Sequence, residues 1–291
     1  MSAYKLRLNK AETASLKEQG FTLIELSIVL VIIGLIVGGV LVGQDLIRAA
    51  EVRATIAQIE KYNTAVNTFR GKYNALPGDM NASTASAFGF AARGANGGQG
   101  DGNGVIEGYN GTSALGYFQA GETLSFWSDL SVGNAATPMN INLIDGSFTL
   151  YALPTTAAPT ITSANASSYY PAAKLGRGNS IYVYSTNGTN YYGIAPVTTA
   201  AGVVGTLTAS MTVSQAYQID KKTDDGFPAT GNVSATWASG GLAENAAAAI
   251  VNAAATGSVA ATTCYDSTLN VFALSQNNGA GANCALSFRF Q

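Results

Sequence analysis

The chain has 291 residues, of which 47% are hydrophobic and only 11% are charged. It contains no histidine, which excludes Ser-His-Asp and Cys-His catalysis and every histidine-ligated metal site. Its formal net charge is −2, and residues 76–291 hold 6 bases against 11 acids. Because nucleic-acid binding needs clustered Lys and Arg, we expect no specific nucleic-acid partner. We expect a structural protein rather than an enzyme.

One continuous apolar segment, residues 21–43, dominates the N-terminal region. Its single charged residue is Glu25. A helix needs about 20 apolar residues to cross a hydrocarbon core of about 30 Å, so this segment predicts a transmembrane helix. A carboxylate inside such a span is costly and therefore suggests a function. The preceding residues 1–20 are polar and carry four bases: Lys5, Arg7, Lys10 and Lys17.

Residues 20–25 read Gly-Phe-Thr-Leu-Ile-Glu. With a basic leader before it and an apolar helix after it, this motif resembles the N-terminus of type IV prepilins and type II secretion pseudopilins. The resemblance implies that a prepilin peptidase cuts after Gly20 and methylates the new N-terminal Phe21. It also implies that Glu25 pairs with the N-terminal amine of a neighbouring subunit. That pairing is physically reasonable, because a buried carboxylate is tolerated when a cation neutralises it.

An ordinary signal peptide or a plain membrane anchor is the alternative interpretation of this segment. An ordinary signal peptide is cut after its apolar region, whereas Gly20 precedes the apolar region. A plain anchor has no use for Glu25. The motif therefore favours the prepilin interpretation.

The resemblance also implies a function and a set of partners. The chain would be a structural subunit of a type IV pilus-like filament, a homopolymer assembled by an inner-membrane platform and its ATPase, with no required cofactor. It would be inserted in the inner membrane as a precursor and then lie in an extracellular pilus. The alternatives are a type II secretion pseudopilin of a periplasmic pseudopilus, and a minor pilin or adhesin. An exposed aromatic groove near Tyr169-Tyr170 or Tyr191-Tyr192 would support the adhesin.

The predicted fold is α+β and pilin-like, with a leader at residues 1–20, a long helix at 21–75 and a globular head at 76–291. After residue 43 the helix becomes amphipathic, because apolar residues recur at spacings of 3, 4 and 7. They are Val52, Ile56, Ile59, Val66, Phe69 and Tyr73. We expect this outer half to pack on the head, while the inner half spans the membrane.

Four glycines interrupt the apolar segment, namely Gly34, Gly38, Gly39 and Gly43. One explanation is close packing of neighbouring membrane helices. The other is a stretch that loses helicity when subunits pack into a filament, since each interior glycine costs roughly 1 kcal/mol relative to Ala.

The head is expected to be a mainly antiparallel β-sheet. Residues 180–185 and 190–194 are rich in β-formers and flank Asn187-Gly188, which is a strong hairpin signal. Residues 208–220 are compatible with a short helix, and residues 284–290 alternate like a closing strand.

The head contains two cysteines, Cys264 and Cys284. An even pair in an exported chain predicts a disulfide; two buried free thiols are the alternative. A disulfide-bounded loop near the C-terminus also recurs in type IV pilins, so the resemblance agrees.

Two acidic segments are candidate calcium sites, because calcium prefers several oxygen ligands from a flexible loop. In the glycine-rich segment 100–107 the candidate ligands are Asp101, Asn103, the Val105 carbonyl and Glu107. In segment 219–228 they are Asp220, Asp224 and Asp225. The alternative for each is ordinary turn chemistry, since Gly, Asp and Asn favour turns without any ion.

Overall fold

The computed structural model describes residues 21–109, 114–115, 120–131, 141–149, 159–201, 204–235, 254–255 and 262–290. The predicted leader, including Gly20, lies outside these residues. The chain divides into two compact units, Met1–Ile47 and Arg48–Gln291, and the division falls inside the long N-terminal helix.

The described helices are α1 (Leu23–Tyr73), α2 (Ala82–Ala87), α3 (Glu122–Leu130) and α4 (Val213–Thr223), with short 3-10 turns η1 (Ala166–Ser168) and η3 (Asn277–Gly279). The first seven strands are β1 (Gly108–Tyr109), β2 (Ala114–Leu115), β3 (Ile161–Thr162), β4 (Ser180–Thr186), β5 (Thr189–Ala195), β6 (Val197–Ala201) and β7 (Val204–Leu207). The remaining strands are β8 (Val233–Ser234), β9 (Ala254–Ala255), β10 (Tyr265–Asp266), β11 (Val271–Phe272) and β12 (Leu286–Arg289). The predicted α+β class is confirmed.

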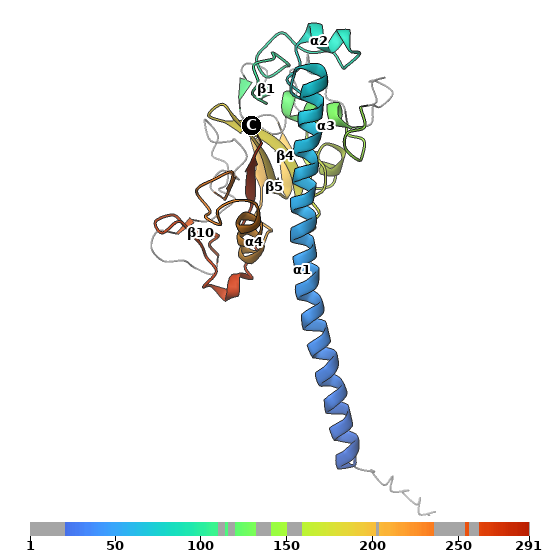
Figure 1. Cartoon of the computed structure of the whole chain (residues 1–291), viewed down its shortest axis with the longest axis vertical. Helices are drawn as coiled ribbons and strands as arrows, with labels where there is room; N and C mark the ends of the chain where they lie inside the picture. Colours follow the sequence, from blue (N-terminus) through green and yellow to red (C-terminus); the bar gives the residue numbers. More distant parts are fainter. Residues whose placement is uncertain are drawn as a thin grey trace, which may run out of the picture. The chain divides into compact units, whose positions relative to one another are not determined.

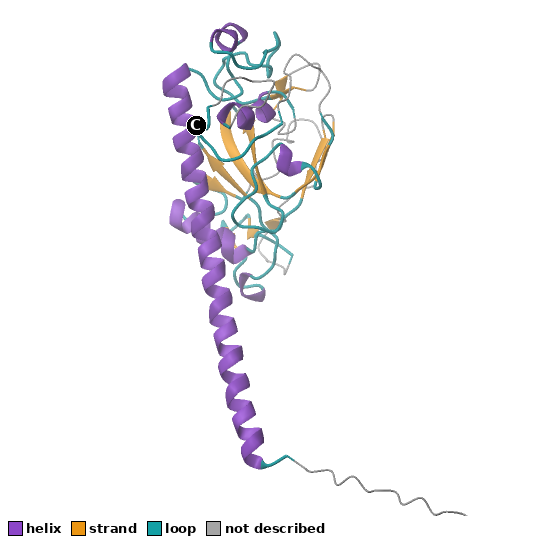
Figure 2. Cartoon of the chain, turned by 90° about the vertical axis from the view of Figure 1, so that its right-hand side faces the viewer, coloured by secondary structure: helices purple, strands orange, loops and turns teal. Residues whose placement is uncertain are grey.

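The outer half of α1, from residue 48 onward, is the central core element of the head unit. One face of it is buried: Val52, Thr55, Ile59, Tyr62, Ala65, Val66, Phe69 and Tyr73. Figures 1 and 2 show this half lying beside the strands β4 and β5. The predicted amphipathic face is confirmed. Apart from the tyrosines, Thr55 is the one polar residue on this buried face. Its hydroxyl donates to the Glu51 backbone carbonyl at 2.8 Å, so the buried oxygen has a hydrogen-bond partner within the helix.

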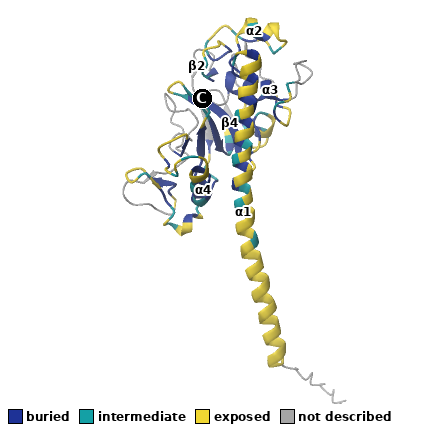
Figure 3. Cartoon of the chain, in the orientation of Figure 1, coloured by how far each residue is buried: buried dark blue, intermediate teal, exposed yellow. Residues whose placement is uncertain are grey.

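Aromatic side chains fill the space between α1, α3 and the sheet. The Tyr62 ring meets Trp127 of α3 edge-on, with centroids 5.0 Å apart, and reaches Tyr192 of β5 at 6.2 Å. Phe126 and Phe290 extend the same cluster, and Tyr192 stacks on Phe290 at 4.2 Å. Such rings carry much of the apolar area that stabilises a core. Figure 3 shows the buried face of α1 and the buried strands behind it.

The largest sheet has the strand order β4-β5-β12-β8, and all of its pairs are antiparallel. β4 and β5 form the predicted hairpin, closed at the Thr186–Thr189 pair. Asn187 and Gly188 both have positive φ, 49° and 71°, which is the conformation that a two-residue turn of type I′ requires. Two three-stranded sheets, β3-β6-β7 and β11-β10-β9, and the β1-β2 pair complete the described ladders. Only β9 and β10 pair in parallel among the described strands.

Two predicted elements have different bounds in the structure. The helix expected at 208–220 begins later, because Thr212 forms a capping box with Gln215 and fixes the start of α4 after it. Met211, inside the predicted helix, instead pairs with Cys284 in an isolated β-bridge. The closing strand expected at 284–290 is β12, which is shorter at both ends.

Candidate functional site

Thr22 and Glu25 form a capping box at the start of α1. The Thr22 hydroxyl accepts a hydrogen bond from the Glu25 backbone N–H at 3.3 Å. The Glu25 carboxylate in turn accepts from the Thr22 backbone N–H at 2.8 Å and from the Thr22 hydroxyl at 2.7 Å. This arrangement satisfies backbone donors that the first helical turn leaves without partners. Glu25 therefore has a local structural role in addition to any role between subunits.

The inner part of α1 is apolar on all sides. An 18-residue stretch of α1 has a mean hydropathy of 2.9, and none of its residues is buried. Phe21, just before the helix, is 85% exposed. Side chains of this kind do not stay in water, so a bilayer or other helices must cover them. By length and composition, α1 is able to cross a membrane.

The four glycines of the apolar segment lie inside a continuous helix. A Cβ atom added at Gly34, Gly38, Gly39 or Gly43 would meet nothing within 4 Å. Nothing in the described part of the chain therefore requires glycine at these four positions. Both explanations from the sequence, close approach of another helix and local loss of helicity, remain predictions.

Two buried carboxylates, neither of them predicted from the sequence, hold the glycine-rich loop. Asp79 accepts hydrogen bonds from the N–H groups of Gly102 (2.8 Å) and Gly104 (2.7 Å). Glu122, the first residue of α3, accepts from Gly100 at 2.7 Å and from Glu107 at 2.9 Å. The four carboxylate oxygens thus all have backbone donors.

Asp79, Asp101 and Glu122 form a group of three carboxylates whose nearest oxygens lie within 4.8 Å of one another. Burial is the main cause that raises the pKa of Asp79 to about 7, and the neighbouring Asp101 adds to it. Burial likewise raises the pKa of Glu122 well above its usual range, with Asp79 as the second cause. The backbone donors oppose these increases without cancelling them.

The predicted calcium ligands of the glycine-rich loop contact one another through an amide. The Asn103 side-chain NH₂ donates to Asp101 and to Glu107, at 3.1 Å each, and its carbonyl oxygen accepts from the Val105 N–H at 2.7 Å. Asn103 N–H also donates to Asp101 at 3.0 Å. Asn103 thus acts as a donor between two carboxylates, which is the geometry of a turn. Calcium binding at Asp101, Asn103, Val105 and Glu107 stays a prediction.

The second acidic segment brings its three aspartates together after α4. One oxygen each from Asp220, Asp224 and Asp225 lies within 4.8 Å of the others. Asp220 is fully buried, Asp224 is half-buried and Asp225 is exposed. Burial raises the pKa of Asp220 to about 7, and the charges of the other two aspartates contribute to the increase. The three aspartates named from the sequence thus lie together in the structure, and calcium binding there stays a prediction.

A family model described as the prokaryotic N-terminal methylation motif matches residues 15–41. This match covers the Gly20–Phe21 junction, Glu25 and most of the apolar segment.

The chain carries the leader signature of type IV pilins and pseudopilins.

No curated protein and no solved structure matches the chain. The motif supports a type IV pilin-like or pseudopilin precursor, and it implies processing by a prepilin peptidase and polymerisation in general. Together with the apolar α1, it is consistent with a membrane-anchored precursor.

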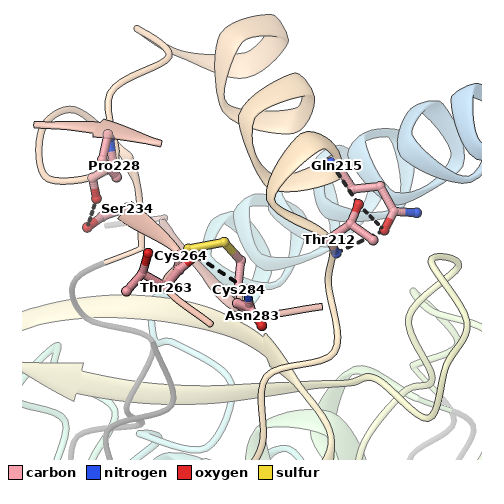
Figure 4. The surroundings of a disulfide bond; sticks show 8 residues. All are labelled: Thr212, Gln215, Pro228, Ser234, Thr263, Cys264, Asn283 and Cys284. Atoms are coloured by element: carbon pink, nitrogen blue, oxygen red, sulfur yellow. Dashed lines mark hydrogen bonds between the residues drawn. A yellow bond between two sulfur atoms is a disulfide. The ribbon is translucent and has the colours of Figure 1, made fainter. Parts of the chain in front are cut away.

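The predicted disulfide of the pilin-like head is present. Cys264 and Cys284 are bonded, with their Cα atoms 5.0 Å apart, and Figure 4 shows the bond beside the start of α4. Cys284 also exchanges two backbone hydrogen bonds with Met211, at 3.0 and 3.1 Å. The bond therefore ties the region before β10 to the segment that leads into α4.

A second missed feature is a fully buried ion pair between Arg93 and Asp129, with 2.6 Å between the guanidinium and carboxylate atoms. The same Asp129 oxygen accepts from the Gly78 N–H at 2.7 Å and so fixes the exit from α1. No spacing in the sequence connects these residues. The capping box at Thr22, in contrast, was readable from the Thr-x-x-Glu pattern.

Proposed function

We propose that this chain is a structural subunit of a type IV pilus-like extracellular filament. A prepilin peptidase would cut after Gly20 and methylate Phe21, and α1 would then polymerise the subunits. The observation that carries the proposal is Glu25, which ends the processing motif and lies in the inner part of α1, where the large apolar side chains of residues 23–42 are all exposed. A single-span anchor explains the apolar surface but not the carboxylate.

The apolar surface of α1 supplies the assembly interface. Its exposed large side chains include Leu23, Ile24, Leu26, Ile28, Val29, Leu30, Val31, Ile32, Ile33, Leu35, Ile36 and Val37. In the bilayer, lipid tails cover these side chains; in a filament, the helices of neighbouring subunits replace the lipid. Because lipid tails are as apolar as Leu, the exchange has little hydrophobic driving force and depends on close packing. Small residues such as Gly38 and Gly39 permit that close approach.

Glu25 supplies the register in this proposal. In a filament core, its carboxylate would lie against the N-terminal amine of a neighbouring Phe21, which is the one cation delivered to the same depth. Processing creates this amine, so cleavage and assembly are coupled through one ion pair. The partners follow: a peptidase, an inner-membrane platform and the ATPase that drives extraction from the inner membrane.

The head forms the outer wall of the proposed filament and has no enzymatic role. The aromatic groove that would have favoured an adhesin does not form from the residues considered. Tyr170 and Tyr192 are fully buried in the core, and Tyr169 and Tyr191 are half-buried. No observation on the described residues favours the pseudopilin or the minor subunit over the main proposal. The experiment below distinguishes among the three.

Mass spectrometry of filaments sheared from the source cells tests the proposal. We expect the main species to begin at methylated Phe21 and to have the mass of a chain with one disulfide. If the processed chain stays in the membrane fraction and the filaments consist of another protein, the pseudopilin or minor-subunit alternative replaces the proposal. A chain that keeps residues 1–20 in every fraction would contradict processing itself.

A further inference from the structure

Three large apolar side chains lie together on the surface of the head, beside α4 and the turn that joins β10 to β11. Phe227 is 47% exposed, Leu269 is 66% exposed and Val271 is 40% exposed. Phe227 and Val271 line the same groove. We call these three side chains the apolar corner. Among the described residues after α1, Phe88 is the one other large hydrophobic side chain with such exposure. Exposed apolar side chains that gather in one place, instead of occurring singly, indicate an interaction surface.

Hydrogen bonds fix the backbone that carries the apolar corner. The Ala229 N–H donates to the side-chain oxygen of Asn270 at 2.9 Å, which joins the loop after α4 to the β10–β11 turn. Within that turn, the Asp266 carboxylate accepts from the Leu269 N–H at 3.1 Å. The turn therefore holds the Leu269 side chain outward before any partner arrives, so binding orders little additional backbone.

A cleft of about 590 Å³ runs beside the outer half of α1. Segments 145–148 and 167–174 supply its other walls, and we call it the side cleft. The buried rings of Tyr62, Phe148 and Tyr170 make its inner surface apolar. A preformed cleft with an apolar interior and a few polar groups at its rim is the usual form of a binding site.

Two sets of contacts hold the walls of the side cleft against α1. The Gln58 side-chain amide donates to the Ala172 carbonyl at 2.9 Å and accepts from the Lys174 N–H at 2.8 Å. The Lys61 ammonium pairs with the Asp145 carboxylate at 2.6 Å. Both walls are thus fixed to the helix within a single chain, and the side cleft does not need a partner in order to form.

The apolar corner and the side cleft carry opposite formal charge. The charged residues that line the side cleft are two bases and one acid, which gives +1: Lys61, Lys174 and Asp145. Segments 220–230 and 265–272, which build the apolar corner, hold four acids and two bases, which gives −2: Asp220, Asp224, Asp225, Asp266, Lys221 and Lys222. Charges of opposite sign around two apolar surfaces favour their association and fix its orientation.

We propose that the apolar corner of one copy of this chain docks in the side cleft of the next copy. Such a contact joins two different surfaces, so each subunit keeps one free surface and the contact can extend into a helical polymer. Figure 1 shows α4 and β10 on one side of α1 and α3 on the other. Segment 141–149, which includes one wall of the side cleft, begins at the end of α3, where the Leu143 N–H donates to the Leu130 carbonyl at 2.9 Å. Both surfaces of one subunit can therefore be occupied at once.

The docking rests on the proposed filament function and adds a contact between heads to the contacts made by α1. Lys174 supplies a cation at the rim, because its backbone N–H, and not its ammonium, holds Gln58. The acidic loop around Asp225 would lie against this rim when Leu269 enters the side cleft.

Cysteine cross-linking in filaments on the source cells tests the docking. The two cysteines of the chain are bonded to each other, so introduced cysteines supply the free thiols. Leu269→Cys and Ala57→Cys, combined in one chain, change two exposed residues, so the variant should fold. After oxidation with copper phenanthroline, we expect dimers, trimers and longer species on non-reducing gels. A disulfide requires Cα atoms within about 7 Å, so this ladder reports direct contact.

The matched control combines Leu269→Cys with Asn67→Cys, which is exposed on α1 but does not line the side cleft. It should give no ladder. Adding Lys174→Glu to the cross-linking pair should lower the cross-linked fraction by about two- to fivefold, as expected for an exposed ion pair. Arg70→Glu makes the same charge change on α1 outside the side cleft and should leave the fraction unchanged.

Three results would overturn the docking. Filaments that contain the chain but show no ladder would contradict it and leave the proposed filament function intact. Dimers without longer species would mean that the contact closes between two copies, and a disulfide within one chain would place the apolar corner against its own subunit. If mass spectrometry finds no copy of this chain in the filaments, the proposed function itself fails, and the docking fails with it.

Discussion

Tyr182 and Gly193 face each other across the β4–β5 ladder, and the tyrosine ring occupies the space that a side chain at residue 193 would fill. Tyr182 is fully buried, so its ring has no room to retreat. The glycine of β5 is thus required by the packing of an aromatic ring rather than by a turn, since its φ is not positive.

Gly193→Ala should therefore destabilise the head by about 1–3 kcal/mol, which is typical of overpacking. Urea unfolding of the chain in detergent measures this cost. Gly188→Ala is the comparison, because that turn glycine has open space and only a positive φ of 71°, so its cost should be about 1 kcal/mol. In a Tyr182→Ala background the cost of Gly193→Ala should largely vanish. An equal cost in both backgrounds would rule out the steric explanation.

The Asp129→Asn variant should destabilise the chain strongly. It leaves the buried Arg93 guanidinium without its carboxylate and weakens the acceptor for Gly78. Removing one partner of a buried ion pair costs about 3–5 kcal/mol. Replacing both residues, with Arg93→Met and Asp129→Leu, should cost less than the single change, because no charge is left buried. The urea unfolding midpoints of the two variants test this prediction. If the double variant is less stable than the single one, the buried unpaired charge is not the main cost of Asp129→Asn.

Asp79 should make stability depend on pH in the presence of a chelator. The pKa of its carboxyl is about 7 in the folded chain, against an ordinary value of 3.8. The folded state therefore holds the proton more tightly, so the contribution of this carboxyl to stability is fully present below about pH 4 and is lost as the pH rises through 7. The difference is about 3 pKa units at about 1.4 kcal/mol each, so the loss should be on the order of 4 kcal/mol.

Asp79→Asn should flatten this pH dependence, as measured by Tm between pH 4 and pH 8. Glu122 and Asp101 face Asp79, so the variant also removes one cause of the raised pKa of Glu122. The amide cannot accept from both Gly102 and Gly104, so overall stability should fall even though the slope decreases. An unchanged slope would exclude Asp79 as its source.

The disulfide should contribute about 3 kcal/mol to stability. Cys264 and Cys284 are separated by 20 residues, and closing a loop of this length restricts the unfolded chain by about that amount. We expect the paired change Cys264→Ala and Cys284→Ala to lower the urea midpoint, as reduction of the unmodified chain should. Equal midpoints for the oxidised chain and the paired variant would contradict this.

The two roles of Glu25 can be separated by substitution. Glu25→Gln keeps an acceptor for the Thr22 N–H but removes the charge, whereas Thr22→Val removes the capping hydroxyl and keeps the charge. If the proposed ion pair governs assembly, Glu25→Gln should lower the yield of sheared filaments by at least about tenfold, since an unpaired buried charge costs about 3–5 kcal/mol. Thr22→Val should assemble nearly normally.

Immunoblots of filament and membrane fractions give both the yield and the processed fraction for these variants. Glu25→Gln should be processed as efficiently as the unmodified chain. The opposite pattern, with Glu25→Gln assembling and Thr22→Val failing, would assign Glu25 to the helix cap alone.

Local patterns by themselves determined the long helix and the main hairpin. The apolar run predicted a membrane-length segment, and the spacing of Val52, Ile59 and Phe69 predicted the buried face of α1, because a helix repeats every 3.6 residues. Asn187-Gly188 predicted its turn because few residue pairs tolerate two positive φ values. The disulfide and the Gly-Phe-Thr-Leu-Ile-Glu motif at residues 20–25 could likewise be identified from residue types and spacing alone.

Only the tertiary structure decided which of the acidic residues are buried together. Asp79 and Glu122 lie 43 positions apart, and they meet because the exit of α1 and the start of α3 both abut the glycine-rich loop. Of the tyrosines proposed for a surface groove, Tyr170 and Tyr192 instead lie in the core, while Tyr169 and Tyr191 are half-buried. Hydrogen-bond satisfaction and burial depend on the assembled neighbours of a side chain, and sequence spacing carries little information about those neighbours.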